Sequence, residues 1–247
     1  MSGFSDRNAI VTGAANGIGR AISDALLAAG GRVVAVDLAE QDLLQHFEGR
    51  NNVTCLATDV ADDEAPEQIV ETAVETYGGI DFLVNNAGIA IGGPFEELTD
   101  EQWDLIMGVN VRSIFRLSRA AVPYLKQSDA PRIVNLGSIM SDMAGPNLSI
   151  YGASKHAVAG LTKGMAVDLG RFGITVNYLQ PGSIITRMSE PFMEDPEFKA
   201  YWENKAPIGR LGEAEEVAAA AMFLLSEEAR FVSGTGLNVD GGAIVNF

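Results

Sequence analysis

Residues that build disulfides and metal sites are scarce in this chain. Its 247 residues include one cysteine, Cys55, and two histidines, His46 and His156. A single cysteine excludes an intramolecular disulfide and a cysteine zinc cluster, and two histidines are too few for a histidine-rich metal site. We therefore expect no bound metal, and we interpret Cys55, which lies in an apolar run, as a small buried hydrophobic side chain.

Long apolar runs and basic residues are also scarce. No apolar stretch reaches the roughly 20 residues that cross a bilayer, and the polar segment 1–8 lacks the apolar region of a signal peptide. Lys and Arg number 17 against 33 Asp and Glu, so the net charge is −16. An acidic surface repels phosphate backbones. We expect a cytoplasmic protein that binds neither a membrane nor a nucleic acid.

Short apolar runs alternate with longer amphipathic segments. Hydrophobic residues make up 47% of the chain, enough for a sizeable core, and no Pro/Gly/Ser-rich linker divides it. Segments 63–77 and 213–225 show helical periodicity. This alternation predicts an α/β fold, a doubly wound parallel β-sheet of Rossmann type with helices on both faces, in a single domain over residues 1–247. The expected strands are 9–12, 32–36, 53–57, 82–84, 133–136, 174–179 and 237–239.

One segment near the C-terminus differs in composition. Within residues 182–210, bulky apolar side chains stand among charges: Met188, Phe192, Met193, Phe198 and Trp202. Loops after the strands of such sheets build ligand sites. We interpret residues 183–210, with approximate bounds, as a partly mobile substrate lid. An ordinary packed helical excursion is the alternative.

Three glycines follow the first expected strand at a strand-to-helix turn. Gly13, Gly17 and Gly19 would let the backbone approach a pyrophosphate and direct helix N–H groups at it. Asp37 closes the second strand, where an acid accepts hydrogen bonds from an adenosine ribose and repels a 2′-phosphate. Asn16 is neutral, and the loop contains no Lys or Arg. These features favour NAD over NADP. The alternative for Asp37 is a solvated strand-end carboxylate.

A tyrosine and a lysine are spaced for one face of a helix. Tyr151 and Lys155 stand at i and i+4, one turn apart. An ammonium beside a phenol favours the phenolate, so we expect Lys155 to lower the tyrosine pKa and make Tyr151 a usable acid/base near neutral pH. Alone, this pair is a common and weak signal.

Further motifs accompany the pair in a fixed order. Ser138 follows the strand at 133–136 and precedes Tyr151 by thirteen residues, and Asn110 lies inside an expected helix. Asn85-Asn86-Ala87-Gly88 and Pro181-Gly182 each follow a strand. In identity, order and spacing, these motifs resemble the short-chain dehydrogenase/reductase family, in its NAD-preferring branch. The resemblance extends from Thr12 to Gly242.

The resemblance implies four catalytic residues. Tyr151 would be the general acid/base, and Lys155 would hold the nicotinamide ribose and lower the tyrosine pKa. Ser138 would hydrogen-bond the substrate oxygen and stabilise developing charge. Asn110 would hold a water in a proton relay toward Lys155.

The resemblance also implies a cofactor site. Asp59 and Val60 would contact adenine, while Thr186 and the backbone of Ile184 would bind the nicotinamide carboxamide. The complete expected set is Gly13, Asn16, Gly17, Ile18, Gly19, Asp37, Asp59, Val60, Asn86, Ala87, Gly88, Tyr151, Lys155, Pro181, Gly182, Ile184 and Thr186.

Other residues near the motifs have simpler interpretations. His156 points about 100° away from Lys155 on a helix, so we expect a structural role. Met140 and Met143 either line the substrate pocket or pack in the core. Arg187 either pairs with a substrate carboxylate or, as the simpler interpretation, forms a surface salt bridge.

The sequence thus predicts an NAD(H)-dependent oxidoreductase that interconverts a secondary alcohol and its ketone. Candidate substrates are polyols, sugars or sugar acids, steroids and hydroxyacyl groups. One alternative is an NADPH-dependent 3-oxoacyl carrier-protein reductase, with Arg112 and Arg116 as a basic docking patch. A second, of another class, is a non-catalytic nucleotide-sensing protein.

We also expect a homotetramer. In the helix expected from Tyr151 to Arg171, small residues recur along one face, which lets a partner helix approach closely. These residues are Ala153, Ala157, Gly160 and Gly164. The segment 231–247 is apolar and ends without a charged tail, as suits a subunit contact. A monomer or dimer is the alternative.

Overall fold

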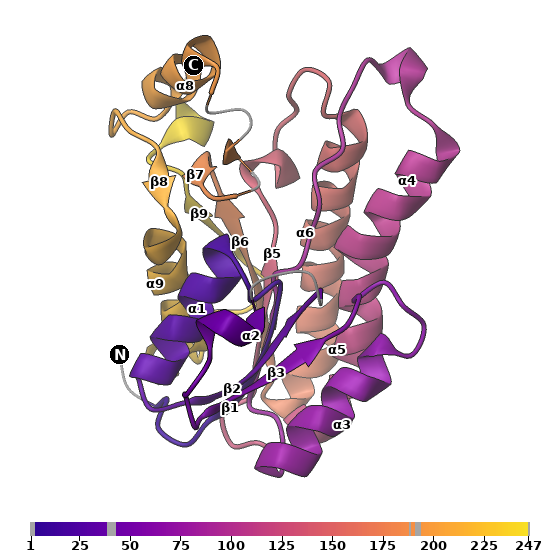
Figure 1. Ribbon diagram of the computed structural model, residues 1–247, viewed down its shortest axis with the longest axis vertical. Coiled ribbons are helices and arrows are strands. Elements are labelled where there is room, and N and C mark those ends of the chain that lie inside the picture. Colours follow the sequence, from indigo (N-terminus) through magenta and orange to yellow (C-terminus); the bar gives the residue numbers. More distant parts are fainter. Residues whose placement is uncertain (1–2, 39–42, 188, 191–193, 247) are drawn as a thin grey trace.

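Seven parallel strands form the central sheet of the computed structural model (Figure 1), which describes residues 3–38, 43–187, 189–190 and 194–246. The strand order is β3-β2-β1-β4-β5-β6-β9. The bounds are β1 (Asn8–Thr12), β2 (Arg32–Asp37), β3 (Val53–Ala57), β4 (Phe82–Asn85), β5 (Arg132–Leu136), β6 (Thr175–Pro181) and β9 (Gly236–Val239). The predicted Rossmann-type sheet is confirmed, and each of the seven expected strands is present within two residues of its expected bounds.

Helices cover both faces of the sheet. On one face α1 (Gly17–Ala28) packs against α9 (Ala214–Leu225), and on the other lie α3 (Ala65–Tyr77), α5 (Ser113–Leu125) and α6 (Ser149–Leu169) (Figure 1). Each face has its own apolar core: the first includes side chains of α1 and α9, and the second includes side chains of α3 and α5. Strands buried on both sides explain the nearly continuous apolar runs in the sequence.

Helix starts follow local capping signals. In α9, Glu213 and Glu216 form a reciprocal capping box, so the helix begins at Ala214. The expected helix at 63–77 begins two residues later, at Ala65, with Pro66 in its first turn. The remaining described helices are α2 (Leu43–His46), α4 (Asp100–Met107) and α8 (Pro196–Lys205). Single 3-10 turns occupy Phe95–Glu97, Ile139–Ser141, Gly170–Phe172, Glu227–Ala229 and Ala243–Val245.

The chain order reverses at β1, which pairs with β2 on one side and with β4 on the other. In open parallel sheets, such a reversal leaves a crevice at the carboxyl ends of the strands, where ligands bind. The glycine loop follows β1, and Asn86 follows β4. The topology therefore places the sequence motifs at one edge of the sheet.

The segment interpreted as a lid forms a small substructure beside this edge. β7 (Ile184–Ile185) pairs in parallel with β8 (Gly212–Glu213), and α8 lies between them in the chain, capped by Asp195. The Lys205 ammonium bonds to the Asn246 carbonyl, which ties α8 to the C-terminal end. Three of the bulky residues named for the lid, Met188, Phe192 and Met193, lie outside the described residues.

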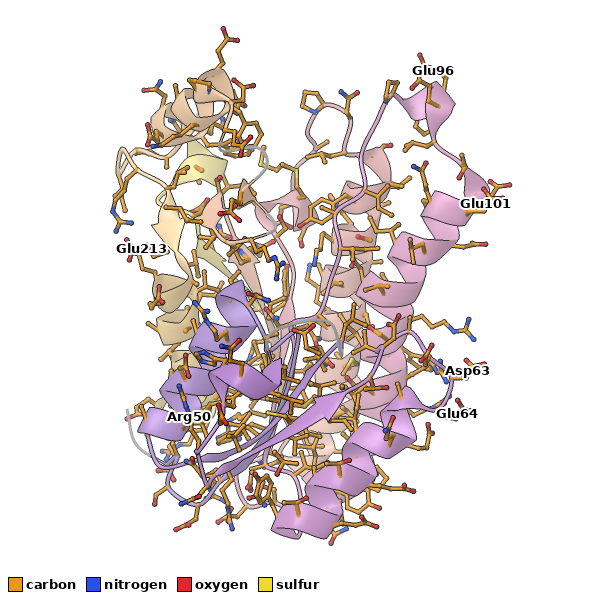
Figure 2. All side chains as sticks on the ribbon, viewed as in Figure 1. Arg50, Asp63, Glu64, Glu96, Glu101 and Glu213 are labelled. Carbon is orange, nitrogen blue, oxygen red and sulfur yellow. The ribbon has the colours of Figure 1, made fainter. Side chains whose placement is uncertain are left out.

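Many acidic side chains lie on the outside of the molecule, where water solvates their charge. Figure 2 labels five exposed examples: Asp63, Glu64, Glu96, Glu101 and Glu213. Over the described ranges, no helix is both long and apolar enough to cross a membrane. Nor do three or more His, Cys, Asp or Glu side chains of these ranges gather as they would around a metal ion.

Candidate active site

Ser138, Tyr151 and Lys155 come together where β5 meets the start of α6. The Ser138 side chain lies near enough to Tyr151 to lower its pKa, and the Lys155 Nζ lies 5.7 Å from the centre of the Tyr151 ring. The Lys155 Nζ also donates a hydrogen bond of 2.9 Å to the carbonyl oxygen of Leu136 at the end of β5. A hydroxyl, a phenol and an ammonium thus share one largely buried site.

Burial sets the acid–base balance of this site. Desolvation raises the pKa of Tyr151 above its usual value, and the interaction with Ser138 partly opposes that rise. Desolvation also lowers the pKa of Lys155 from 10.5 to about 8. The sequence predicted a lowered tyrosine pKa. This expectation is wrong, because desolvation raises the pKa of Tyr151 by more than the interaction with Ser138 lowers it.

Asn110 lies in a π-helical turn, Gly108–Arg112, between α4 and α5 rather than in a regular helix. Its side chain is buried and makes three hydrogen bonds. Nδ2 donates to the Ile89 carbonyl (2.9 Å) and to Ser154 Oγ (3.0 Å), and Oδ1 accepts from the Ile89 N–H (2.8 Å). Such π turns occur frequently at functional sites.

The glycine loop is fastened to the end of β4. Asn86 Nδ2 donates to the carbonyl oxygens of Thr12 (2.9 Å) and Gly13 (3.0 Å), and Thr12 Oγ1 accepts from the N–H groups of Asn86 and Ala87. A Cβ at Gly19 would lie 2.0 Å from the Gly13 carbonyl oxygen, so no side chain fits there. Gly13 has a φ of +66°, which favours glycine.

Asp37 is bonded to two backbone groups. Its Oδ2 accepts from the Ala15 N–H and its Oδ1 from the Leu38 N–H, each at 2.8 Å. The strand-end carboxylate therefore holds the glycine loop and is not merely solvated. Each oxygen retains acceptor capacity for a further donor, such as a ribose hydroxyl.

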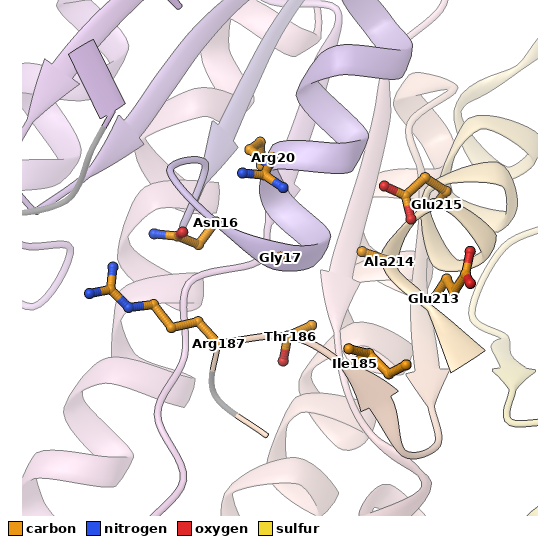
Figure 3. Close-up of a pocket in the computed structure, with 9 residues that line it drawn as sticks. All are labelled: Asn16, Gly17, Arg20, Ile185, Thr186, Arg187, Glu213, Ala214 and Glu215. Carbon is orange, nitrogen blue, oxygen red and sulfur yellow. The ribbon is translucent and has the colours of Figure 1, made fainter. Parts of the chain in front are cut away.

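A pocket of about 300 Å³ lies at the N-terminus of α1 (Figure 3). Its lining includes Asn16 and Gly17 from the glycine loop, Thr186 and Arg187 from the segment after β7, and Arg20. A Cβ at Gly17 would lie 3.1 Å from the Thr186 methyl group, so the two segments are in contact. The open glycine backbone and the helix N-terminus fit the pyrophosphate of a dinucleotide.

The other expected cofactor residues lie around the same edge. The structure places Gly88 between Asn110 and Lys155, since a Cβ there would lie 3.2 Å from Asn110 Oδ1 and 3.6 Å from Lys155 Nζ. Ile18 packs on the first core and Val60 on the second, and Asp59 caps the turn after β3. Pro181 ends β6, and the N–H of Gly182 bonds to the Val239 carbonyl oxygen. Ile184 is buried in β7.

Several residues with simpler interpretations are also placed. His156 is exposed and its Nδ1 lies 2.9 Å from the Gly152 carbonyl, away from Lys155. Met140 is buried and Met143 half-buried. Cys55 is only half-buried, packed beside the first core, because β3 is an edge strand. Arg187 faces the pocket beside the glycine loop, which gives it a ligand-facing position.

Two residues of the site were missed by sequence reasoning. Ser154 is fully buried, and its hydroxyl hydrogen-bonds Asn110 and the Tyr151 carbonyl oxygen. The backbone N–H and carbonyl of Ile89 hydrogen-bond the Asn110 side chain. A small polar residue beside Lys155 on the buried face of the helix was the available signal for Ser154. No sequence signal marks Ile89, because only its backbone takes part.

The chain is similar to several known proteins over most of its length. A family model described as enoyl-(acyl carrier protein) reductase matches residues 13–243. Gluconate 5-dehydrogenase of Gluconobacter oxydans is 38% identical over 250 residues, with 98% of this chain and 96% of that protein covered. The 3-oxoacyl-(acyl-carrier-protein) reductase FabG of Vibrio harveyi is 37% identical over 236 residues, covering 95% and 96%.

A solved structure is similar over its whole length. Levodione reductase superposes with a TM-score of 0.93 at 32% identity, covering 99% of this chain and 100% of that one. The chain belongs to the short-chain dehydrogenase/reductase family. It is therefore an oxidoreductase of the class that uses a nicotinamide cofactor.

Proposed function

We propose that this protein is an NAD(H)-dependent oxidoreductase that interconverts a secondary alcohol and its ketone, with Tyr151 as general acid/base. The observation that carries the proposal is the meeting of Ser138, Tyr151 and Lys155 at the sheet edge where the glycine loop and Asp37 also lie. This arrangement also argues against a non-catalytic nucleotide sensor, which needs no such set.

Each catalytic side chain has a separate task. Tyr151, as phenolate, takes the hydroxyl proton during oxidation and returns it during reduction. Ser138 donates a hydrogen bond to the substrate oxygen and stabilises the charge that develops there. Lys155 holds a ribose and passes protons through a water at Asn110. When bound, the nicotinamide ring exchanges a hydride with the substrate carbon.

Asp37 supports the choice of NAD. Its carboxylate lies at the end of β2 and retains acceptor capacity for ribose hydroxyls, while its negative charge repels a 2′-phosphate. Asn16, in the glycine loop, brings no positive charge to offset that repulsion. We propose that the residues named from the motifs form the complete cofactor site.

Sugar acids are the favoured substrate class, because a relative with 38% identity is a gluconate 5-dehydrogenase. The carrier-protein reductase remains the second candidate, because another relative has that name. Two observations weigh against docking an acidic carrier protein. The net charge is −16, and Arg116 is already bonded to Asp63 and to backbone carbonyls beside it.

Subunit assembly and a lid complete the proposal. The small residues Ala153, Gly160 and Gly164 are exposed along α6, and the apolar side chains of Phe231 and Val245 are exposed near the C-terminus. Two such surfaces support a homotetramer with two kinds of two-fold interface. The segment 183–210, which carries α8, is proposed to close over the substrate.

One screen tests this function. Purified protein is incubated with secondary alcohols, aldonates, 3-ketoacyl thioesters and simple ketones, each with NAD(H) and with NADP(H), and kcat/KM is measured. We expect turnover with aldonates or their keto forms and a strong preference for NAD(H). Equal or better efficiency with NADP(H) would refute the assignment of NAD as the cofactor. Absence of turnover with every substrate would refute the proposal that this protein is an alcohol or ketone oxidoreductase.

A further inference from the structure

Ser154 lies between Tyr151 and Lys155 in the chain, and its side chain is fully buried. Its hydroxyl accepts a hydrogen bond of 3.0 Å from Asn110 Nδ2 and donates one of 2.7 Å to the carbonyl oxygen of Tyr151. One buried hydroxyl therefore joins the π turn at Gly108–Arg112 to the helix that carries the acid/base pair.

The Asn110 amide has no remaining N–H to donate. One N–H of Nδ2 bonds to the Ile89 carbonyl and the other to Ser154, while Oδ1 accepts from the Ile89 N–H. Rotating the amide by 180° would place Nδ2 against the Ile89 N–H, which is donor against donor. It would also place Oδ1 against the Ile89 carbonyl oxygen, which is acceptor against acceptor. Its orientation is therefore fixed, and Ser154 supplies the α6 hydroxyl to which the Asn110 side chain donates.

Gly88 connects the network to the lysine. Its backbone fills the space between Asn110 and Lys155, since a Cβ there would lie 3.2 Å from Asn110 Oδ1 and 3.6 Å from Lys155 Nζ. The lysine is held on its other side by the Leu136 carbonyl. Because protein interiors are close-packed, a shift of the Asn110 turn relative to α6 also shifts the surroundings of Lys155.

We propose that Ser154 is a positioning residue that holds the Asn110 amide and the Ile89 backbone in register with Tyr151 and Lys155. This inference rests on the proposed function, because that function makes Asn110, Tyr151 and Lys155 the catalytic set. Ser154 itself touches neither substrate nor cofactor in this role. Without its hydroxyl, one buried N–H of Asn110 loses its acceptor, and the turn becomes free to move.

A matched pair of variants tests the proposal. Ser154→Ala removes the acceptor beside the site. Thr162→Val removes the equivalent acceptor farther along α6, where Thr162 Oγ1 is buried and accepts from Asn135 Nδ2 at 2.9 Å. Each variant loses one bond from an asparagine amide to a helix hydroxyl, and Ser154→Ala also loses the bond to the Tyr151 carbonyl oxygen, so thermal stability should fall in both and at least as far in Ser154→Ala. Only Ser154→Ala should alter the site.

Three measurements distinguish positioning from simple stability. For Ser154→Ala we expect kcat to fall about tenfold, which is less than the roughly hundredfold or greater loss expected when the acid/base itself is removed, with KM for NAD changed less than about twofold. The midpoint of the pH profile of kcat/KM should rise, because a displaced Lys155 favours the Tyr151 phenolate less. Amide hydrogen exchange at Ile89 should accelerate in the cofactor-free protein. Thr162→Val should leave all three unchanged.

A double variant shows whether Ser154 acts through Asn110. In an Asn110→Ala background, Ser154→Ala should cause no further loss of kcat, since residues in one network are non-additive. Additive losses, an unshifted pH profile, or equal exchange at Ile89 in both variants would overturn the proposal. If Ser154→Ala does not fold, the isosteric pair Ser154→Thr and Ser154→Val provides the same comparison. An inactive wild type would refute the proposed function, whereas the exchange at Ile89 would still test the link to Asn110.

Discussion

The Lys155 ammonium donates a 2.9 Å hydrogen bond to the carbonyl oxygen of Leu136, so a charged group lies inside the protein at the end of β5. Lys155 is 6% exposed. Burial lowers its pKa from 10.5 to about 8 because one carbonyl replaces only part of its hydration. The buried Lys155 ammonium therefore lowers the free energy of unfolding at neutral pH.

Removing this charge should change stability in a pH-dependent way. Between pH 8 and 10.5 the unfolded chain binds more protons than the folded protein, so wild-type stability rises with pH across that window. We compare the free energy of unfolding of Lys155→Met with that of the wild type at each pH. The variant's value minus the wild-type value should be about 2–3 kcal/mol larger at pH 7 than at pH 10. Urea unfolding at both pH values measures this difference.

The control for this experiment is Lys163→Met, which removes an exposed lysine of the same helix. It should change stability equally at the two pH values. Any constant cost of leaving the Leu136 carbonyl without its donor cancels in the comparison of pH 7 with pH 10. A difference for Lys155→Met that does not vary with pH would contradict the buried-charge argument.

Tyr151→Phe should nearly abolish turnover while NAD binding stays close to that of the wild type. The ring and its packing remain, but the group that exchanges the proton with the substrate is lost. We expect kcat to fall at least about a hundredfold, the usual scale for a general acid/base. Steady-state kinetics and calorimetric NAD binding measure the two effects. Retention of more activity would exclude Tyr151 from that role.

Asp37 should affect NAD binding through the loop as well as through the ribose. Asp37→Ala removes the acceptors of the Ala15 and Leu38 N–H groups, whereas Asp37→Asn keeps one oxygen for Ala15. We expect Kd for NAD to rise about tenfold or more in the alanine variant and less in the asparagine variant. Calorimetry provides the values. Identical losses in both variants would mean that the contact with Ala15 contributes nothing to affinity.

Arg187 should bind a cofactor phosphate rather than a substrate carboxylate, because the pocket that it lines includes Gly17 at the N-terminus of α1. Arg187→Gln should weaken ADP-ribose binding about fivefold or more and leave adenosine binding unchanged. Arg112→Gln, an exposed change on α5's N-terminal side, is the control. A rise confined to KM for an acidic substrate would instead support carboxylate recognition.

Gly160 tests the proposed assembly. Apart from its chain neighbours and the adjacent backbone of α6, no atom of the described residues lies within 4 Å of a Cβ placed at Gly160. A larger side chain is therefore tolerated in an isolated chain and would stabilise α6 by up to about 1 kcal/mol. In a tetramer that packs this face closely, Gly160→Leu should lower the mass measured by light scattering. Gly79→Leu, equally open and outside α6, should not lower that mass. A wild-type monomer would refute the assembly.

Local patterns were sufficient for most of the fold. Apolar runs marked all seven strands of the main sheet, and the spacing of Gly13, Gly17 and Gly19 after the first of them located the crevice. These signals are readable because burial on both faces and close backbone approach each restrict residue type directly. The π turn at Gly108–Arg112 was not predicted, because its residues have the periodicity of an ordinary helix.

The sequence by itself predicted the family, the Rossmann-type parallel sheet and its seven strands, since these depend on motifs and apolar runs within short stretches of chain. The same motifs are the basis on which the catalytic residues are proposed. The tertiary structure decided which groups share hydrogen bonds and how they titrate. Asp37 bonds to Ala15 across 22 positions, and Asn110 to Ser154 across 44. Burial, which reversed the expected direction of the Tyr151 pKa, arises from packing between distant segments, and no local pattern encodes the water that such packing removes.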